Sequence, residues 1–132
     1  MMNGIKIDSR ELQDAVKDAL SEYGDAVLDV LSDAIEKTAE ETAQDLKSAG
    51  SFKGKKYRKT WKSEIQINRG GVSATVYNAK NYQLTHLLEF GHAIKSGGRT
   101  VGQTRAFPHI EAENEKAQKR VLELLEEGVS KL

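Results

Sequence analysis

The sequence contains no cysteine among its 132 residues, which excludes disulfide bonds and thiolate metal sites. Long hydrophobic runs are also absent, and the longest apolar stretches are far shorter than a membrane-spanning helix requires. The first ten residues, MMNGIKIDSR, lack the apolar core of a signal peptide. We therefore expect a protein that neither crosses a membrane nor carries an obvious export signal.

Recognisable catalytic motifs are missing as well. We find no nucleophile elbow, no P-loop and no dinucleotide-binding fingerprint. Gly97-Gly98-Arg99 is too weak a signal for a phosphate cradle, and the spacing of serines and histidines implies no catalytic triad. The sequence therefore predicts neither an enzyme nor a cofactor.

Charge is abundant and unevenly distributed. Charged residues make up 30% of the chain and hydrophobic residues 38%, which is polar for a globular monomer. Residues 1–50 hold 12 acids and 5 bases, a net charge of −7, whereas residues 51–110 hold 11 bases and 2 acids, a net charge of +9. Such a chain can attract an acidic partner or copies of itself. Two interpretations fit this composition. Either the chain is one domain with a solvated helix, or neighbouring subunits complete the burial of its apolar residues.

The N-terminal part predicts a long amphipathic helix over residues 8–49. Asp8 is placed to cap it, Gly50 to end it, and Gly24 to kink or split it. Apolar residues recur mostly every three or four positions from Leu12 to Leu46, as on one face of a helix. Unbroken, it would span about 40 residues, or roughly 60 Å. Either it is kinked and folded onto its own sheet, or it also packs on a neighbouring subunit.

Residues 51–61 form a basic linker in this interpretation. Its bases surround Phe52 and Tyr57 and are Lys53, Lys55, Lys56, Arg58 and Lys59. Bases interleaved with aromatic residues can bind nucleic acid. A solvated surface loop is the alternative reading of the same residues.

The remainder predicts an α+β fold in one domain, with the long helix packed on a small antiparallel sheet. Alternating apolar residues on either side of Gly70-Gly71 indicate a β-hairpin over residues 62–77. A short helix over 81–90 would direct its leucines and Phe90 toward the core. A glycine-rich loop over 91–107 follows, and then a C-terminal helix over 108–131 with Pro108 in its first turn. Because long loops in small domains are usually functional, we expect this one to meet a partner.

His86, Glu89 and His92 form the only arrangement that suggests a metal site. Zinc could accept such ligands, but the spacing is not that of a known zinc motif. We favour structural roles and expect no bound metal. Glu89 is one of two acids in the basic middle of the chain, so we expect it to pair with a base or accept from loop amides.

Leu87-Leu88-Glu89-Phe90-Gly91-His92-Ala93, followed by the glycine-rich loop and Pro108-His109-Ile110, resembles a bacteriophage family. It is the family of small head–tail connector proteins of long-tailed phages and prophages, also labelled neck, tail-completion or tail-component proteins. The specific part of the resemblance covers residues 87–110, and the order of elements extends it loosely over nearly the whole chain.

This resemblance implies a virion structural protein at the head–tail junction that assembles into a ring between connector and tail, without catalysis. Its partners would be copies of itself and neighbouring phage proteins, and it would be in the host cytoplasm before assembly. The alternative is a small nucleic-acid-binding module that uses residues 53–62 and 95–105. The residues expected to shape the ring contacts are Glu89, Phe90, Gly91, His92, Arg99, Arg105 and Pro108. Those expected to face DNA are Lys53, Lys55, Lys56, Arg58 and Lys59.

Overall fold

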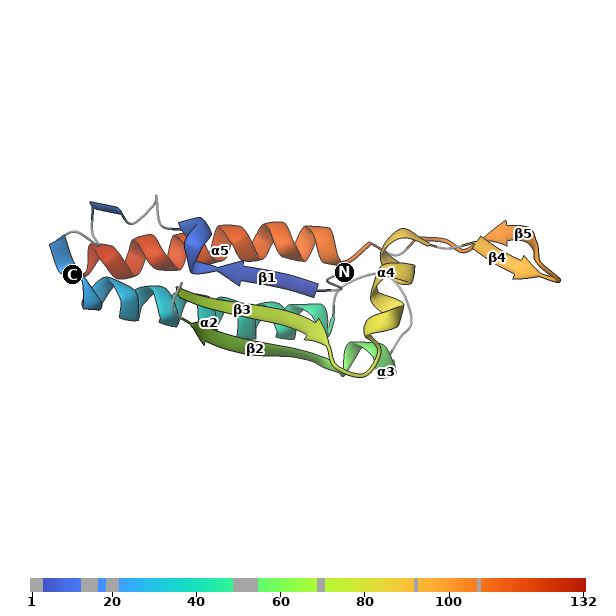
Figure 1. The fold of residues 1–132 in the computed structure, drawn as a ribbon, viewed down its shortest axis with the longest axis horizontal. Helices are drawn as coiled ribbons and strands as arrows, with labels where there is room; N and C mark the ends of the chain where they lie inside the picture. The colour runs from blue at the N-terminus through green and yellow to red at the C-terminus, as the bar shows by residue number, and fades with distance from the viewer. Residues whose placement is uncertain are drawn as a thin grey trace.

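The fold is a small sheet laid on two long helices, with a narrow arm projecting from one end (Figure 1). It is known from a computed structural model, which describes residues 4–12, 17–18, 22–48, 55–68, 71–91, 93–106 and 108–132. The predicted α+β class, with a long helix packed on a small antiparallel sheet, is confirmed.

The sheet has three antiparallel strands in the order β1-β3-β2. Strands β2 (Trp61–Asn68) and β3 (Gly71–Asn78) form the predicted hairpin, in continuous register from Trp61 opposite Asn78 to Asn68 opposite Gly71. Strand β1 (Gly4–Asp8) pairs with the other side of β3. A lone hairpin is marginally stable, and this third strand together with the helices supplies its support.

Strand β1 corrects the predicted start of the long helix. Ile5 and Ile7 are buried and Lys6 between them is exposed, which is the alternation of a half-buried strand. Asp8 does cap a helical turn, since its Oδ1 accepts from the backbone N–H of Arg10 at 3.0 Å. That turn is only the 3-10 helix η1 (Ser9–Leu12). In the sequence, the alternation of apolar and polar residues over the five residues of β1 is too short to outweigh the helix-capping signal at Asp8. The pairing with β3 is what makes this segment a strand.

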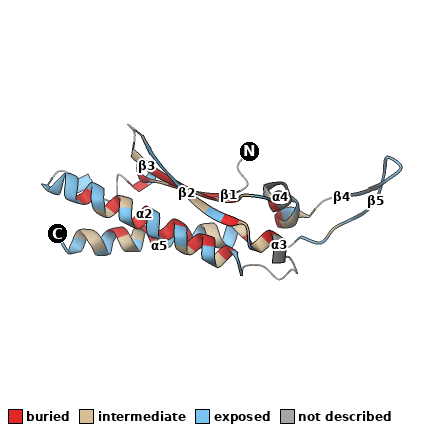
Figure 2. Ribbon diagram, turned by 90° about the horizontal axis from the view of Figure 1, so that it is seen from below, coloured by how far each residue is buried: buried red, intermediate tan, exposed pale blue. Residues whose placement is uncertain are grey.

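Helix α2 (Asp25–Leu46) begins directly after Gly24, whose φ of 50° is not helical. Residues 17–18 and 22–23 are also helical, so the split predicted at Gly24 is confirmed, while the start predicted at residue 8 is wrong. Residues 49–50 lie outside the described part. Helix α2 packs against the sheet and α5, and its buried residues, red in Figure 2, recur at helical spacing. They are Val27, Leu31, Ala34, Ile35, Thr38, Ala39, Thr42, Ala43 and Leu46.

Helix α5 (Ile110–Ser130) is the predicted C-terminal helix and runs antiparallel to α2. It buries Ala117, Val121 and Leu125 against the common core, whereas Leu132 lies beyond its end and is exposed. Pro108 precedes the helix instead of occupying its first turn. None of the helices in the described ranges is long and apolar enough to cross a membrane.

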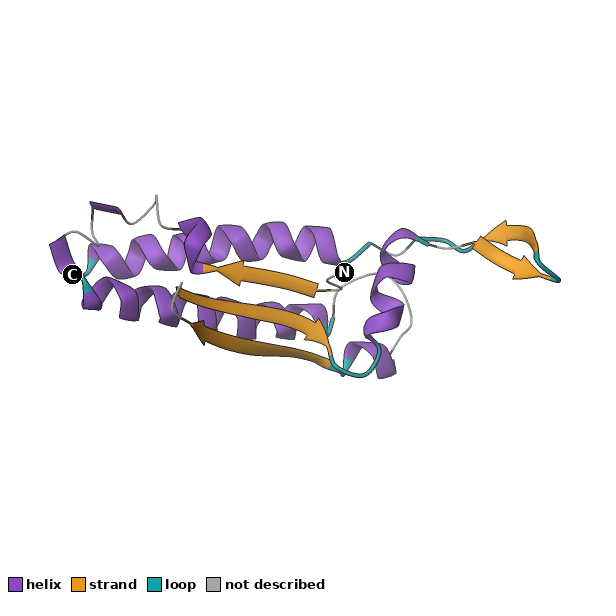
Figure 3. Cartoon of the chain, in the orientation of Figure 1, coloured by secondary structure: helices purple, strands orange, loops and turns teal. Residues whose placement is uncertain are grey.

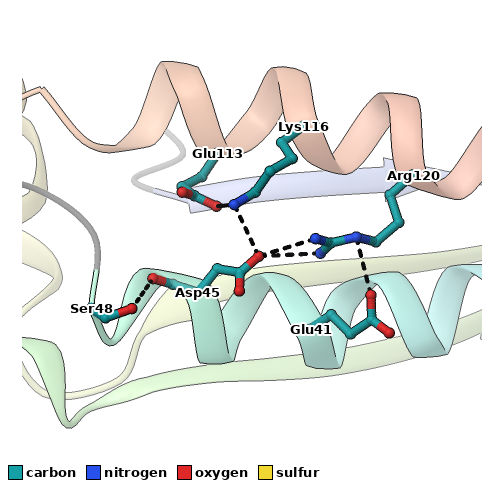
Figure 4. A network of polar contacts seen from close by, with 6 residues as sticks. All are labelled: Glu41, Asp45, Ser48, Glu113, Lys116 and Arg120. Atoms are coloured by element: carbon teal, nitrogen blue, oxygen red, sulfur yellow. Dashed lines mark hydrogen bonds and ion pairs between the residues drawn. The ribbon is translucent and has the colours of Figure 1, made fainter.

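Ion pairs join the two helices along their exposed flank (Figure 4). Arg120 on α5 contacts Glu41 at 3.0 Å and Asp45 at 3.2 Å on α2. Lys116 lies 3.2 Å from the same Asp45 and 3.1 Å from Glu113. These pairs are partly solvated, so their stabilising contribution is modest, about 1 kcal/mol or less for each.

The remaining elements lie at the end of the body from which the arm projects (Figure 3). Helix α3 (Lys55–Arg58) is a single turn inside the segment predicted to be a basic linker, and α4 (Tyr82–Phe90) is the predicted short helix. The segment predicted as a glycine-rich loop over 91–107 instead contains strands β4 (Ala93–Ser96) and β5 (Arg99–Gln103). These form a hairpin that turns at Gly97 and Gly98, both with positive φ.

Candidate assembly site

Glu89, near the end of α4, caps the start of α5. Its Oε1 accepts from the backbone N–H of His109 at 2.6 Å and of Ile110 at 2.8 Å, and its Oε2 accepts from that of Glu111 at 3.1 Å. The first amides of a helix have no partners within the helix and carry its positive dipole end. A buried carboxylate therefore fits this position, and it fixes α4 to α5.

A buried polar chain continues from Glu89 through His109 to Tyr57. His109 Nδ1 lies 3.1 Å from Glu89 Oε1, and His109 Nε2 lies 2.8 Å from the Tyr57 hydroxyl. The same hydroxyl lies 3.0 Å from Thr85 Oγ1. A carboxylate only accepts, so Nδ1 holds its proton toward Glu89, and in a neutral ring Nε2 accepts from Tyr57. The rings of Tyr57, Trp61 and His109 also meet edge to face.

The surroundings of these buried polar groups shift the pKa values of Glu89 and Tyr57. Burial acts to raise the pKa of Glu89, but the three backbone N–H donors and the His109 ring outweigh it and hold that pKa below its usual value. Burial raises the pKa of Tyr57 to about 12, against the hydrogen bond to Thr85. The carboxylate and the neutral phenol are therefore the forms that the folded chain favours.

Gly91 brings the two ends of the arm together. Its φ is +73°, and a Cβ placed there would lie 2.6 Å from the backbone oxygen of Thr104. Only a residue without a side chain allows the returning backbone to pass so closely. With Glu89 holding residues 109–111, the Glu89-Phe90-Gly91 sequence fixes both the root of the arm and the start of α5.

The arm, which we define as residues 93–103, extends away from the body (Figure 1). Every arm side chain that the structure describes is exposed, including Ile94 at 43% and Val101 at 61%. A register shift between Ile94 and Lys95 marks a β-bulge. Phe90 at the root is 63% exposed, so its predicted orientation toward the core is wrong. Apolar residues exposed on a projecting hairpin indicate a surface that meets another molecule.

The other predicted interface residues divide into buried and exposed groups. Glu89 is 7% exposed and acts within the chain, whereas Arg99, Arg105 and Pro108 are exposed. His92 lies outside the described residues. Sequence reasoning expected Glu89 to pair with a base or with loop amides, and the structure gives it the amides of α5 together with His109.

Tyr57 and His109 were not predicted as members of one buried cluster. Tyr57 was interpreted as an aromatic residue among bases. Its role is revealed only by the ring of Trp61 and the hydroxyl of Thr85, which the fold brings beside it. In the sequence, His109 stood out as part of the Pro108-His109-Ile110 motif, and no hydrogen-bonding partner was predicted for it. A histidine in the first turn of a predicted helix, with an unpaired acid upstream, is the signal that could have pointed to the cap.

The metal interpretation has no support in the described part of the chain, where no group of three potential ligands gathers. His92 and the side chain of His86 lie outside it. Glu89 directs both oxygens at backbone amides, as described above.

The basic segment is only partly described. Lys53 and the side chains of Lys55 and Lys56 lie outside the described residues, Lys59 is exposed, and Arg58 is half-buried. Tyr57, at 4% exposure, is closed to base stacking. The prediction that Tyr57 is an aromatic residue available to nucleic acid is therefore wrong.

A protein-family comparison gives the context for this geometry. Residues 14–91 match the model of the family described as "Bacteriophage HK97-gp10, putative tail-component". The chain belongs to this family. The predicted resemblance to phage neck and tail components is thereby confirmed, and the chain is a structural tail component of a bacteriophage virion that interacts with other tail proteins.

The match to the HK97-gp10 family ends at Gly91. It includes α2, the hairpin β2–β3, α4 and Glu89, but neither the arm nor α5. No curated protein and no solved structure matches the chain.

Proposed function

We propose that this tail component is a subunit of a ring at the head–tail junction, lying between the connector and the tail. It acts by assembly, with no catalytic turnover. Its partners are copies of itself and the adjoining connector and tail proteins, and the subunit is in the host cytoplasm before it assembles. The observation that supports this proposal is the projecting arm, whose apolar residues are exposed in the single chain.

A ring requires each subunit to present two unlike surfaces that meet head to tail. The molecule is elongated, with the arm at one end, and its charge is divided between an acidic N-terminal part and a basic middle. An asymmetric subunit of this kind favours a repeating heterologous contact over a symmetric pair. Exposed apolar groups at the arm would be covered on assembly, which explains why they are tolerated.

The experiment is complementation of the encoding phage after deletion of this gene. If the subunit closes the junction, the deletion yields DNA-filled heads and separate tails, visible by negative-stain electron microscopy, and the intact gene restores joined particles. An armless variant, with residues 94–102 replaced by two glycines, should fail to restore them. Ala93 and Gln103 are paired across the hairpin, so two residues can close the shortened turn.

Infectious, joined particles from the deletion itself would contradict the junction role. Tails that are absent or of abnormal length, with no accumulation of completed tails, would place the subunit elsewhere in the tail. Absolute mass by light scattering after size exclusion tells whether a ring forms without the head or tail as template.

The proposal also includes contact with DNA. A ring at the junction surrounds the path of the genome, and exposed Lys59 is a basic side chain that could face phosphates. Binding of the purified chain to duplex DNA should then weaken steeply with salt and weaken further in Lys59→Gln. Absence of binding at low salt would remove DNA from the list of partners.

A further inference from the structure

The open edge of the sheet is the feature of the body with no assigned role. In the order β1-β3-β2, strands β1 and β2 are the two edges. On β1, the Gln118 side chain of α5 donates to the backbone oxygen of Lys6 at 3.2 Å, and α5 packs beside that strand. On β2, no hydrogen bond from outside the sheet reaches the backbone of residues 61–68 within the described structure.

Strand β2 also lacks the features that usually protect an edge. It is eight residues long, pairs with β3 without a bulge and contains no proline; its charged residues, Lys62 and Glu64, lie in its first half, and residues 65–68 carry no charge. Ile65 and Ile67 lie on the face that carries Ala74 and Val72, toward the helices, yet Ile67 is 79% exposed. A long, regular and partly apolar edge is a template for another strand.

The arm has the complementary deficiency. Its two strands pair extensively only with each other, and an isolated two-stranded hairpin is marginally stable in water. Adding it to a third strand would extend its sheet and cover apolar residues on both partners. Because the arm lies at one end of an elongated molecule, it reaches the β2 edge of another copy more readily than its own (Figure 1).

Charge favours the same pairing. Between Glu89 and Glu111 the chain has three bases and no acid: Lys95, Arg99 and Arg105. Helix α2, which packs under β2, carries seven acids and one lysine. Five of those acids are exposed and make no ion pair within the described residues: Asp25, Asp29, Asp33, Glu36 and Glu40. A basic arm is therefore attracted to the acidic side of a neighbour.

We propose that the arm of one copy adds as a strand to the β2 edge of the next copy, so that the two sheets become continuous between subunits. The contact is heterologous: the arm is used on one side of each subunit and β2 on the other, as a closed ring requires. Backbone hydrogen bonds supply the affinity, and Ile65, Ile67, Ile94 and Val101 supply the apolar contact. This inference rests on the proposed ring function and specifies its joint.

The absence of cysteine from the chain makes site-specific crosslinking a direct test. The double variant Val101→Cys with Ile67→Cys is supplied to the deleted phage, and purified particles are treated with a short bis-maleimide. We expect a ladder of covalent multimers of this chain on a denaturing gel. The matched control is Val101→Cys with Lys6→Cys, which places the second thiol on an exposed side chain of β1, the edge that α5 covers; it should give no ladder.

Blocking the edge provides a second measurement. Ile67→Lys places a charge where the arm would pack, and should abolish the crosslinking of Val101→Cys to a cysteine introduced at Ile65. Gln66→Lys adds the same charge to the opposite face of β2 and should leave that crosslink intact, because Gln66 is exposed beside Ser73.

The outcomes separate this joint from the function. Particles that contain the double variant but yield no ladder, or that crosslink equally through position 6, overturn the docking of the arm on β2 and leave the junction role standing. Crosslinks from position 101 to a different tail protein would show that the arm binds that protein instead of a second copy of this chain. Joined particles that lack the chain altogether overturn the proposed function instead.

Discussion

Glu89 connects the end of α4 to the start of α5, twenty residues later in the chain. It accepts hydrogen bonds from three backbone N–H groups. It also contacts the His109 ring, which in turn lies within hydrogen-bonding distance of the Tyr57 hydroxyl. At this scale, the acid in the family-like motif is part of the internal framework of the subunit. Its effect on assembly would be indirect, through the position of the arm root.

Replacing Glu89 should therefore destabilise the isolated chain. Glu89→Gln removes the charge that complements the helix terminus and the His109 ring, at a cost of about 1–2 kcal/mol. Glu89→Ala leaves amides and an imidazole buried without an acceptor and should cost about 2–4 kcal/mol. Urea denaturation of the purified variants measures both. Glu115→Gln, an exposed acid on α5, is the control and should change stability by less than about 0.5 kcal/mol.

The contribution of Glu89 to the stability of the folded chain should depend on pH. The pKa of Glu89 is lowered from 4.5 in the folded chain, so its ionised form is favoured by folding. Its contribution is fully present above about pH 4.5 and is lost as pH falls through the lower, folded pKa. The stability difference between the natural chain and Glu89→Gln should be constant near neutrality and should shrink in that acidic range. A difference that grows on acidification would contradict this assignment.

At the scale of elements, α2 and α5 are held at close distance by a glycine. A Cβ at Gly128 would lie 2.4 Å from Val30 Cγ1, so the absence of a side chain sets how closely the helices approach. Ion pairs occupy the flank near the other end of α5, through Lys116 and Arg120. The helix pair is thus defined by a steric contact at one end and by electrostatic contacts at the other.

Gly128→Ala should destabilise the chain although alanine is the better helix former by about 1 kcal/mol. Overpacking against Val30 typically costs about 1–3 kcal/mol, so we expect a net loss of about 1–2 kcal/mol. In a Val30→Ala background the space is available, and the same substitution should become neutral or stabilising. A double-mutant cycle in thermal or urea unfolding reports this reversal; equal effects in both backgrounds would show that the contact is not limiting.

At the scale of the whole molecule, the arm is separate from the core that stabilises the body. The core residues come from the three-stranded sheet, η1, α2, α5, Tyr57 and the partly buried Leu88, whereas the described arm side chains are exposed. In the proposed ring, stability and assembly would therefore be carried by different parts of the chain. A change in the arm would then alter contacts between subunits without altering the fold.

The armless variant should accordingly unfold at nearly the same urea concentration as the natural chain, within about 0.5 kcal/mol. Circular dichroism should show unchanged helix content. Gly91→Ala is the informative comparison, because it disturbs the arm root, where a positive φ and the Thr104 oxygen oppose a Cβ, and should cost about 1–3 kcal/mol. An armless chain that is strongly destabilised would mean that the arm supports the body.

The sequence by itself determined the local elements whose patterns are long or strongly marked. Helical periodicity predicted α2 and α5, and alternation around Gly70-Gly71 predicted the β2–β3 hairpin. The motif around Glu89 and Pro108 predicted the family. These signals succeed because each depends on residues that follow one another in the chain, without a distant partner.

Only the tertiary structure decided what depends on distant partners. Strand β1 exists because β3 offers it an edge to pair with, and residues 93–103 form a hairpin whose two ends meet because Gly91 leaves room for Thr104. Tyr57, Glu89 and His109 form one chain of contacts although up to 52 residues separate them. Short segments carry too little periodicity to fix their own state, and a buried polar group shows its role only when its hydrogen-bonding partner is beside it.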